Sequence, residues 1–426
     1  MNSKVLRKTA RHVAQCALLV IAAVAVTLLL LEFILRLAGH ETADGQFIFA
    51  GIELQPYALP LGRLAEQIAE YEDNIDRVTL IYDELVGWKY RPDSSRQNGE
   101  FSINGAGLRS QREYDVQPPP DTLRIALFGD SFTAGDDASD ETAWSHHLEV
   151  NLNRAGVRAE VLNFGVSAYG MDQAYLRWLH GGSQVSPDIV VFGLQAENLD
   201  RNVNVFRQLI HPEGPAFSKP RFVVSDDALN LVNSPAIPPE KLVEIFASFA
   251  SHPLSDHEAY YRSRDYASQW WSGSKLASMI FAIVNQQMED EAVSYGLESK
   301  RGKLGKAIVE AFAADVLAAG KPFIIVFLPH KEFFEQQFYG REIPYQDLLD
   351  YFRDNYHYLS LADYVDPEIK SLKNWGPTLH YGPELNSLVA ELLSDEIAAC
   401  IQGAACQLSR FDDISDFAIP AAAPSE

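Results

Sequence analysis

The chain of 426 residues has little cysteine and a deficit of basic residues. Its three cysteines, Cys16, Cys400 and Cys406, are too few for a disulfide scaffold or a cysteine-rich zinc module. Lys and Arg total 35 against 58 Asp and Glu, which gives a formal net charge of -23. No Lys/Arg stripe runs through the body of the chain, so we expect no nucleic-acid partner, because such partners require a basic face.

Two of the cysteines lie close together in the sequence CIQGAAC, at Cys400 and Cys406. In an oxidising compartment they could form a disulfide. They could equally be two free thiols, because sequence spacing does not define the geometry that a disulfide needs.

The composition is that of a folded protein, with 47% hydrophobic and 22% charged residues. The length allows one large domain or two ordinary ones. The strongly acidic balance implies solubility and repulsion of anionic partners but identifies no substrate.

The N-terminus differs from the rest of the chain. Residues 1–11 carry four basic residues and no acid, and residues 12–31 carry no Asp, Glu, Lys or Arg. This run is long enough to cross a bilayer as a helix, so we predict a membrane anchor at 12–38 with residues 1–11 in the cytoplasm. The alternative is a cleaved signal peptide, whose apolar region is usually shorter, roughly 7–15 residues, and is followed by a small-residue cleavage site.

Beyond the anchor, three further regions are predicted. Residues 39–95 form a membrane-proximal segment, with helical spacing of apolar residues at 61–75. Residues 96–405 form the main domain, and 406–426, acidic and then rich in Ala and Pro, form a loose tail.

The main domain alternates apolar strands with helices. A fully apolar strand is typical of a parallel sheet covered on both faces, so the pattern predicts a three-layer α/β/α domain around a central parallel sheet. The predicted strands are 123–128, 159–165, 188–194, 323–329 and 357–363, and two of the predicted helices are 141–156 and 171–182.

This alternation is interrupted between about 205 and 300, a stretch too long for a simple connection. It contains a predicted hairpin within 218–238. We interpret the stretch as an insertion, either a lid or substrate-facing wall, or a packing subdomain that touches no ligand.

Three polar patches follow predicted strands, and ligands of open parallel sheets bind outside the carboxyl ends of the strands. In LFGDSFTAGDD, Ser131 follows the first strand with its hydroxyl and N–H available. In NFGVSAYGMDQ, Gly165 follows the second strand and could present a backbone N–H. In FGLQAENLDRN, Asn198 follows the third strand and could donate its amide to an oxyanion. Taken singly, each is also explained as a turn or cap residue.

A fourth patch, NWGPTLHYGPELNSLVAELL, places His380 in a polar loop before a predicted last helix. A loop at this point can bring an imidazole to the strand ends. No metal site is expected, because the adjacent pair His146 and His147 on a predicted helix points to different faces.

Together these patches resemble the SGNH (GDSL-like) hydrolase superfamily over about residues 122–395. The stretches VGWKYRPDSS (86–95) and SINGAGLRSQ (102–111) resemble the lead-in of its membrane-anchored bacterial members. The resemblance implies a flavodoxin-like fold and no cofactor. It further implies Ser131 as nucleophile, His380 as its base, and an oxyanion hole from the N–H groups of Ser131 and Gly165 and the amide of Asn198.

The chain departs from the family pattern at two positions. Members usually carry an Asp three residues before the catalytic His, where this chain has Pro377. Either a backbone carbonyl or a carboxylate elsewhere must then orient His380, and Asp363 and Asp366 are the candidates. Leu199 stands where many relatives carry a supportive Asp after the oxyanion-hole Asn.

We therefore predict a serine esterase anchored in a bacterial inner membrane, with its catalytic domain in the periplasm or outside. The expected substrates are small-molecule or polysaccharide acyl esters, especially acetylated envelope carbohydrate. The alternatives are an O-acetyltransferase that uses the same Ser/His site, and a non-catalytic envelope scaffold that keeps the fold. Nothing in the sequence indicates an oligomeric state.

Overall fold

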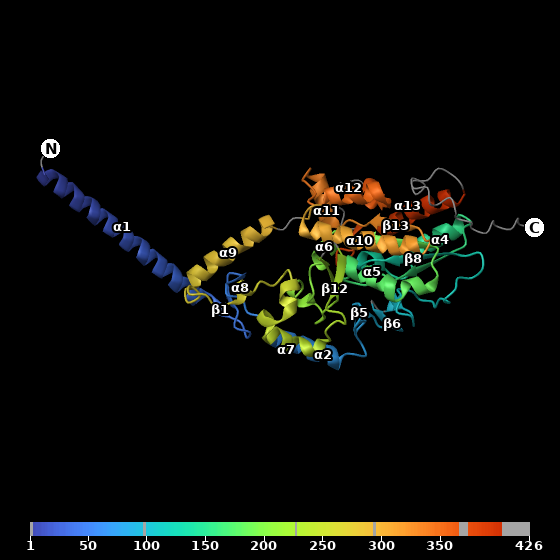
Figure 1. Cartoon of the computed structure of the whole chain (residues 1–426), viewed down its shortest axis with the longest axis horizontal. Helices are drawn as coiled ribbons and strands as arrows, with labels where there is room; N and C mark the ends of the chain where they lie inside the picture. The colour runs from blue at the N-terminus through green and yellow to red at the C-terminus, as the bar shows by residue number, and fades with distance from the viewer. Residues whose placement is uncertain (1–2, 97–98, 226–227, 293–294, 366–373, 403–426) are drawn as a thin grey trace, which may run out of the picture. The chain divides into compact units, whose positions relative to one another are not determined.

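The computed structural model describes residues 3–96, 99–225, 228–292, 295–365 and 374–402 (Figure 1). The chain divides into two compact units. One comprises Met1–Gln67, Val243–Ser255 and Tyr261–Val293, and the other comprises Ile68–Leu242, Asp256–Tyr260 and Ser294–Glu426. Of the predicted insertion at about 205–300, residues Val243–Ser255 and Tyr261–Val293 group with the N-terminal residues, and the rest group with the sheet.

The first unit begins with the long helix α1 (Ser3–Ala38). The most apolar 18-residue window of its segment Arg11–Ala38 has a mean hydropathy of 2.9. The segment is long and apolar enough to cross a membrane, although a signal sequence would meet the same criteria. The unit's other elements are the strands β1 (His40–Glu41), β2 (Phe47–Phe49) and β3 (Ile52–Glu53), the short helices η5 (Phe249–Ser251) and α8 (Ser263–Tyr266), and the longer helix α9 (Lys275–Ala292). Three further helices include residues at the boundary between the units: α2 (Leu61–Asp73), α7 (Leu242–Ala247) and η6 (Pro253–His257).

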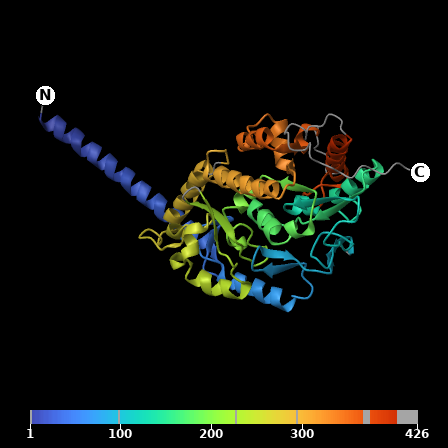
Figure 2. The same ribbon diagram turned by 45° about the vertical axis from the view of Figure 1, so that its right-hand side comes forward.

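The second unit is built on a five-stranded sheet in the order β14-β13-β10-β8-β9, with every neighbouring pair parallel (Figures 1 and 2). The strands are β8 (Leu123–Phe128), β9 (Ala159–Asn163), β10 (Ile189–Leu194), β13 (Phe323–Phe327) and β14 (His357–Ser360). The prediction of a central parallel sheet is confirmed. The predicted fifth strand was too long, since residues Leu361–Asp363 form the 3-10 helix η7.

Helices cover both faces of this sheet. On one face, the Phe128 ring of β8 packs 5.9 Å from Trp178 of α5 and 5.7 Å from Phe312 of α10, measured between ring centroids. On the other face, Asn163 of β9 donates a hydrogen bond of 3.2 Å to Ser145 of α4. The helices are α4 (Trp144–Arg154), α5 (Met171–His180), α10 (Lys300–Ala318) and α13 (Pro383–Ile401), and α13 packs on α4. The domain is therefore the predicted three-layer α/β/α sandwich.

The remaining elements surround this sandwich. Strands β11 (Arg221–Ser225) and β12 (Ala228–Val232) pair antiparallel, which confirms the predicted hairpin. Two other antiparallel pairs join β4 (Leu80–Asp83) to β5 (Gly87–Tyr90) and β6 (Ser94–Arg96) to β7 (Phe101–Ile103). The short helices are α3 (Ser131–Ala134), η2 (Gly182–Val185), α6 (Asn198–Arg201), η3 (Arg207–Leu209), η4 (Pro239–Lys241), α11 (Lys331–Phe338) and α12 (Gln346–Asn355).

The strand order decides where a ligand can bind. The chain leaves β8 to form β9 on one side and then crosses to β10 on the other, so the direction of winding reverses between β8 and β10. At such a switch point the connections diverge and leave a crevice beyond the carboxyl ends of the strands. Ser131 follows β8 and Asn198 follows β10, so both residues lie at this crevice.

Candidate active site

Ser131 is the first residue of α3, directly beyond the end of β8. The turn between them requires Gly129, whose φ is +157° and where a Cβ would lie 2.1 Å from Thr133 Oγ1. Asp130 caps the helix by accepting a 2.9 Å hydrogen bond from the Phe132 N–H. The sharp turn and the cap together place the Ser131 side chain at the crevice.

His380 reaches this serine from the loop before α13. Its Nε2 lies 2.7 Å from Ser131 Oγ, a hydrogen-bond distance. The imidazole also packs on Phe132, with ring centroids 4.8 Å apart. The two side chains come from residues 249 positions apart in the chain, and this contact is the arrangement that a serine nucleophile and its base need.

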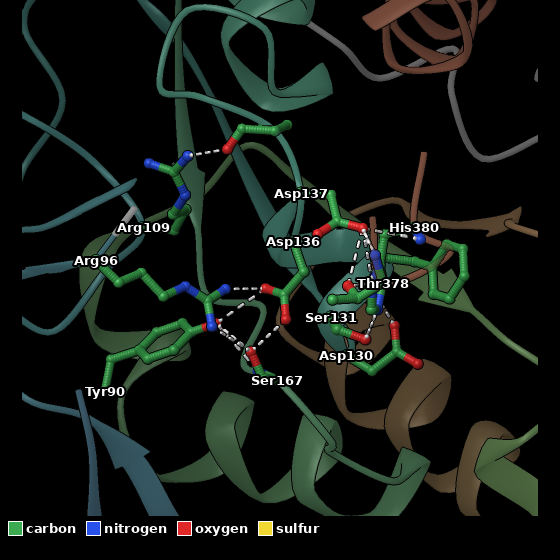
Figure 3. Close-up of polar contacts among 12 residues, drawn as sticks. Tyr90, Arg96, Arg109, Asp130, Ser131, Asp136, Asp137, Ser167, Thr378 and His380 are labelled. Atoms are coloured by element: carbon green, nitrogen blue, oxygen red, sulfur yellow. Dashed lines mark hydrogen bonds and ion pairs between the residues drawn. The ribbon is translucent and has the colours of Figure 1, made fainter. Parts of the chain in front are cut away.

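Asp137, which the sequence interpretation did not single out, lies on the other side of the imidazole (Figure 3). Its Oδ2 is 3.7 Å from His380 Nδ1. The same oxygen accepts hydrogen bonds from the Thr378 N–H (2.7 Å), the Thr378 hydroxyl (2.8 Å) and the His380 N–H (3.3 Å). Gly376 makes room for this carboxylate, because a Cβ there would lie 2.3 Å from Asp137 Cβ.

These contacts determine the tautomer of His380. An ionised carboxylate only accepts hydrogen bonds, so the single proton of the Thr378 hydroxyl is donated to Asp137. Thr378 Oγ1 lies 2.8 Å from His380 Nδ1 and must therefore accept the Nδ1 proton. Nε2 is then unprotonated and faces Ser131 as an acceptor. A chain of hydrogen bonds thus runs from Ser131 through His380 and Thr378 to Asp137.

Of the two acids suggested by the sequence, Asp363 does not hold this position. Asp363 lies in η7 and its carboxylate binds Arg353 Nη2 at 3.1 and 3.2 Å, so it is engaged elsewhere. Asp366 lies outside the described residues. The carboxylate beside His380 belongs instead to Asp137, six residues after the serine. Two sequence features could have pointed to Asp137. It is the second acid of the Gly-Asp-Asp run that ends LFGDSFTAGDD, and Pro377 stands where relatives of the SGNH superfamily usually carry the acid.

Asn198 is fully buried and has a free amide donor. Its Oδ1 accepts a hydrogen bond of 3.0 Å from Arg201 Nη1. Its Nδ2 has no partner among the residues that the structure describes. A buried donor without an acceptor is costly, and an oxyanion formed at the crevice would supply that acceptor. Asn198 is not among the residues that line the cavity, so its role in an oxyanion hole stays a prediction.

Gly165 does not fit its predicted role. Its N–H donates a 2.9 Å hydrogen bond to the Asn163 side chain and is not available to a ligand. A Cβ at Gly165 would lie 2.6 Å from the Ala134 nitrogen, so the glycine serves close packing against α3. Sequence reasoning chose the glycine nearest the strand, but the turn toward the crevice comes three residues later.

Ala168, three residues after Gly165, is another candidate for a backbone donor at the cavity. It lines the cavity beside Ser131 and has the left-handed φ of +67°. Within the described part of the chain, no acceptor bonds its N–H. A glycine would favour this backbone conformation, but alanine occupies it, so the sequence carried no glycine signal there.

Arg201 connects several of these groups. Its Nη1 donates to Asp130 Oδ2 (2.9 Å), to the Tyr169 carbonyl (3.0 Å) and to Asn198 Oδ1 (3.0 Å). Burial raises the pKa of the Asp130 carboxyl, and the charge of Arg201 opposes that rise. Because Arg201 binds Asn198 Oδ1, it fixes the orientation of the Asn198 amide. Nδ2 is then the end of the amide that does not face Arg201.

A second polar group holds the loop before Ala168. Ser167 Oγ donates to Asp136 Oδ2 at 2.7 Å and lies 2.8 Å from the Tyr90 hydroxyl (Figure 3). Arg96 pairs with the other oxygen of Asp136 and stacks 3.7 Å over the Phe101 ring. These contacts tie the Ala168 turn to the segment that carries Ser131 and Asp137.

The crevice contains a cavity of about 380 Å³ whose lining includes Ser131, His380 and Ala168. Among the described residues, no group of three or more His, Cys, Asp and Glu is placed to hold a metal ion. Cys406 lies outside the described residues, so the question of a pair with Cys400 does too.

Comparison with known proteins gives a weak likeness. No protein-family model and no curated protein sequence matches the chain. A solved structure from Desulfitobacterium hafniense DCB-2, described as a lipolytic protein of the G-D-S-L family, is 12% identical, with a TM-score of 0.31, covering 64% of this chain and 98% of that chain. A second solved structure is 14% identical with a TM-score of 0.32, covering 66% and 97%. The function below is therefore inferred from the geometry of the site.

Proposed function

We propose that this chain is a serine ester hydrolase of the SGNH type. The observation that carries the proposal is the 2.7 Å contact between Ser131 Oγ and His380 Nε2, with the base oriented by Thr378 and Asp137. Nucleophile, base and orienting groups at hydrogen-bond distance are the signature of nucleophilic acyl transfer. The contacts among Ser131, His380, Thr378 and Asp137 support a catalytic role over a scaffold role.

The reaction follows from these positions. Ser131 Oγ attacks the ester carbonyl carbon while its proton passes to His380 Nε2. The carbonyl oxygen becomes an oxyanion, which the N–H groups of Ser131 and Ala168 and the Asn198 amide stabilise. His380 then donates the proton to the leaving alcohol as the carbon–oxygen bond breaks. Water, deprotonated by His380, releases the acid from the acyl-enzyme and regenerates Ser131.

The direct test is hydrolysis of p-nitrophenyl acetate by the wild-type protein and by Ser131→Ala. The variant removes only an Oγ and should fold normally while losing turnover. Unchanged turnover would refute Ser131 as the nucleophile. An O-acetyltransferase would pass through the same acyl-enzyme, and adding a sugar acceptor to the assay separates the two, because a transferase forms acetylated sugar at the expense of acetate. Of the two, we propose hydrolysis, with acetylated envelope or extracellular carbohydrate as substrate.

We further propose that residues 12–38 anchor the chain in a bacterial inner membrane, with 1–11 in the cytoplasm, and that residues 39–95 connect the anchor to a catalytic region at 96–405 outside. Only 6% of the most apolar window of the span is buried inside the structure, as a lipid-facing helix requires. At its C-terminal end, Glu32 accepts hydrogen bonds from the N–H groups of Lys275 and Leu276. Trp270, five residues before Lys275 in the sequence, is 94% exposed, and tryptophan is enriched at membrane interfaces.

The location is tested by fractionation. A retained anchor leaves the full-length chain in carbonate-washed membranes, and external protease removes the catalytic region from spheroplasts. A cleaved signal peptide would instead release a shortened soluble protein whose N-terminus begins after residue 38.

A further inference from the structure

Most of the charged residues that line the cavity beside Ser131 are held in ion pairs. Among its lining residues, Asp136 pairs with Arg96, and Glu197 pairs with Arg201 at 2.8 Å. Lys331 lies 3.7 Å from Glu335. Arg207 also lines the cavity, and its guanidinium forms no ion pair or hydrogen bond within the described part of the chain.

The surroundings of Arg207 disfavour its positive charge. Burial lowers the pKa of Arg207 to about 9, and the charge of Arg201 lowers it further. Glu197 is the one acid whose charge raises the Arg207 pKa, and that acid is already bonded to Arg201. Glu332, another acid of the lining, raises the pKa of Tyr345, as Glu197 does. A desolvated cation without a partner is unfavourable unless a ligand supplies the opposite charge.

The backbone that carries Arg207 is held firmly in place. The Arg207 N–H donates to the Phe217 carbonyl at 3.0 Å. The two preceding N–H groups, of Val205 and Phe206, donate to the buried carboxylate of Glu258 at 2.7 and 3.0 Å. These hydrogen bonds fix the backbone at Arg207, which limits how far its side chain can move from the cavity into solvent.

Arg207 lines the same cavity as Ser131 and His380. In addition to burial, the charge of Arg201 lowers the pKa of Arg207. Arg201 also donates a hydrogen bond to Asn198, whose amide N–H is the proposed oxyanion donor. His211, four residues later in the same segment, lines the cavity too, and burial lowers its pKa. A neutral imidazole there can donate or accept a hydrogen bond without adding a second charge.

We propose that Arg207 forms a subsite for a carboxylate of the substrate, so that the preferred ester carries a carboxylate near the scissile bond. A guanidinium presents two parallel N–H groups that match the two oxygens of a carboxylate. Because the acids Glu197 and Glu332 also line the cavity, a ligand with one negative charge is favoured over a phosphate dianion. The proposal rests on the proposed esterase function, and the carboxylate could belong to the acyl group or to the alcohol.

The test compares charged and neutral esters. For the acyl side, the pair is mono-p-nitrophenyl succinate and p-nitrophenyl acetate. For the alcohol side, the pair is 4-acetoxybenzoate and its methyl ester. The kcat/KM of each is measured for wild type, Arg207→Gln, Arg207→Lys and the exposed control Arg341→Gln, at low and high salt.

We expect the wild-type protein to prefer the charged member of one pair, and that pair identifies the side that carries the carboxylate. In Arg207→Gln this preference should fall about 10–100-fold, the value of one charge-assisted contact, mostly through KM. For the neutral ester, the kcat/KM of Arg207→Gln should stay within about 3-fold of the wild-type value. A change of about 3-fold corresponds to less than half the free energy of a change of about 10-fold. Arg207→Lys should keep part of the preference, and Arg341→Gln all of it.

Equal use of charged and neutral esters by wild type, or a preference that survives Arg207→Gln, would overturn the subsite. Failure of the esterase proposal looks different, because no ester would then be hydrolysed in a Ser131-dependent way. In that case, calorimetric titration of D-glucuronate and D-glucose into the wild-type protein tests the subsite alone. Selective glucuronate binding that Arg207→Gln abolishes would support it, and equal or absent binding of the two sugars would refute it.

Discussion

Replacing Asp137 by Asn tests whether this carboxylate orients and stabilises His380. The substitution keeps size and one oxygen but removes the negative charge 3.7 Å from His380 Nδ1. His380 becomes positive only when it holds the serine proton, so the attraction acts in the transition state and not in the resting enzyme. The loss should therefore appear in kcat with little change in KM.

The size of the effect follows from the distance. Two unit charges 3.7 Å apart attract by about 4.5 kcal/mol at an effective dielectric constant of about 20. The imidazole retains some solvent contact, with 18% of its side chain exposed, so we discount this to about 3–4 kcal/mol. At 1.36 kcal/mol for each factor of ten, kcat should fall by about 10²–10³.

The assay is steady-state hydrolysis of p-nitrophenyl acetate, with circular dichroism to establish that the variant is folded. The matched control is Asp363→Asn, which removes the acid that the sequence suggested and that pairs with Arg353. This control should retain activity within about 2-fold, because exposed ion pairs contribute little. A folded Asp137→Asn with more than a fifth of wild-type kcat, or an equally large loss in Asp363→Asn, would refute the reasoning.

Three further predictions follow from the same contacts. Thr378→Val should lower kcat by about 3–10-fold, the value of one neutral hydrogen bond, while Thr378→Ser restores it; the loss should be smaller than in Asp137→Asn, and a larger one would contradict the relay. Asn198→Ala should lower kcat by about 10²–10³, as measured by the same hydrolysis assay, and unchanged turnover would exclude its amide from the oxyanion hole. Lys219→Met should destabilise the fold by about 3–5 kcal/mol, because it leaves the buried Asp172 carboxylate without its partner. Urea unfolding measures this last effect, and a variant as stable as wild type would contradict it.

The sheet could be predicted from the sequence because its central strands are almost entirely apolar. The runs at Leu123–Phe128 and Ile189–Leu194 are apolar except for Arg124 and Gly193, and every residue in them is buried, as parallel strands covered on both faces require. Arg124 is buried because it pairs with Glu160 on the neighbouring strand. The pairing of Ser131 with His380 was also predictable, since strand ends and the loop before the last helix meet at one edge of such a sheet.

The orienting acid was not predictable from the motif alone. Asp137 acts through Thr378, 241 residues away, and its carboxylate fits only because Gly376 leaves space for it. Sequence reasoning searched near the end of the domain, where the family usually carries this acid. The structure supplies an equivalent charge from the nucleophile's own loop, at a non-glycine residue with φ of +68°.

The oxyanion-hole assignment erred for a similar reason. A glycine next to a strand is an obvious candidate for an exposed N–H, but the Asn163 side chain occupies the N–H of Gly165. Ala168, which lines the cavity, has a left-handed backbone and follows Ser167, whose hydroxyl is bonded to Asp136. Backbone conformation of this kind is not encoded in residue type.

The boundaries of the insertion were also beyond the sequence pattern. Residues 205–300 interrupt the strand–helix alternation, but periodicity does not say which part of the chain they pack against. The hairpin β11–β12 and Glu258 belong with the sheet domain, whereas α9 and the residues from Tyr261 that precede it group with the N-terminal residues. The Glu258 hydrogen bonds that hold the segment before Arg207 depend on this arrangement.

The central claim, that His380 activates the Ser131 hydroxyl as a nucleophile, is tested most directly by covalent labelling. The protein is treated with an alkyl fluorophosphonate, and the adduct is located by peptide mass spectrometry. We predict one phosphonyl group on Ser131, no labelling of Ser131→Ala, and greatly slowed labelling of His380→Ala. A folded protein that remains unlabelled, or that carries the group on another residue, would contradict the account.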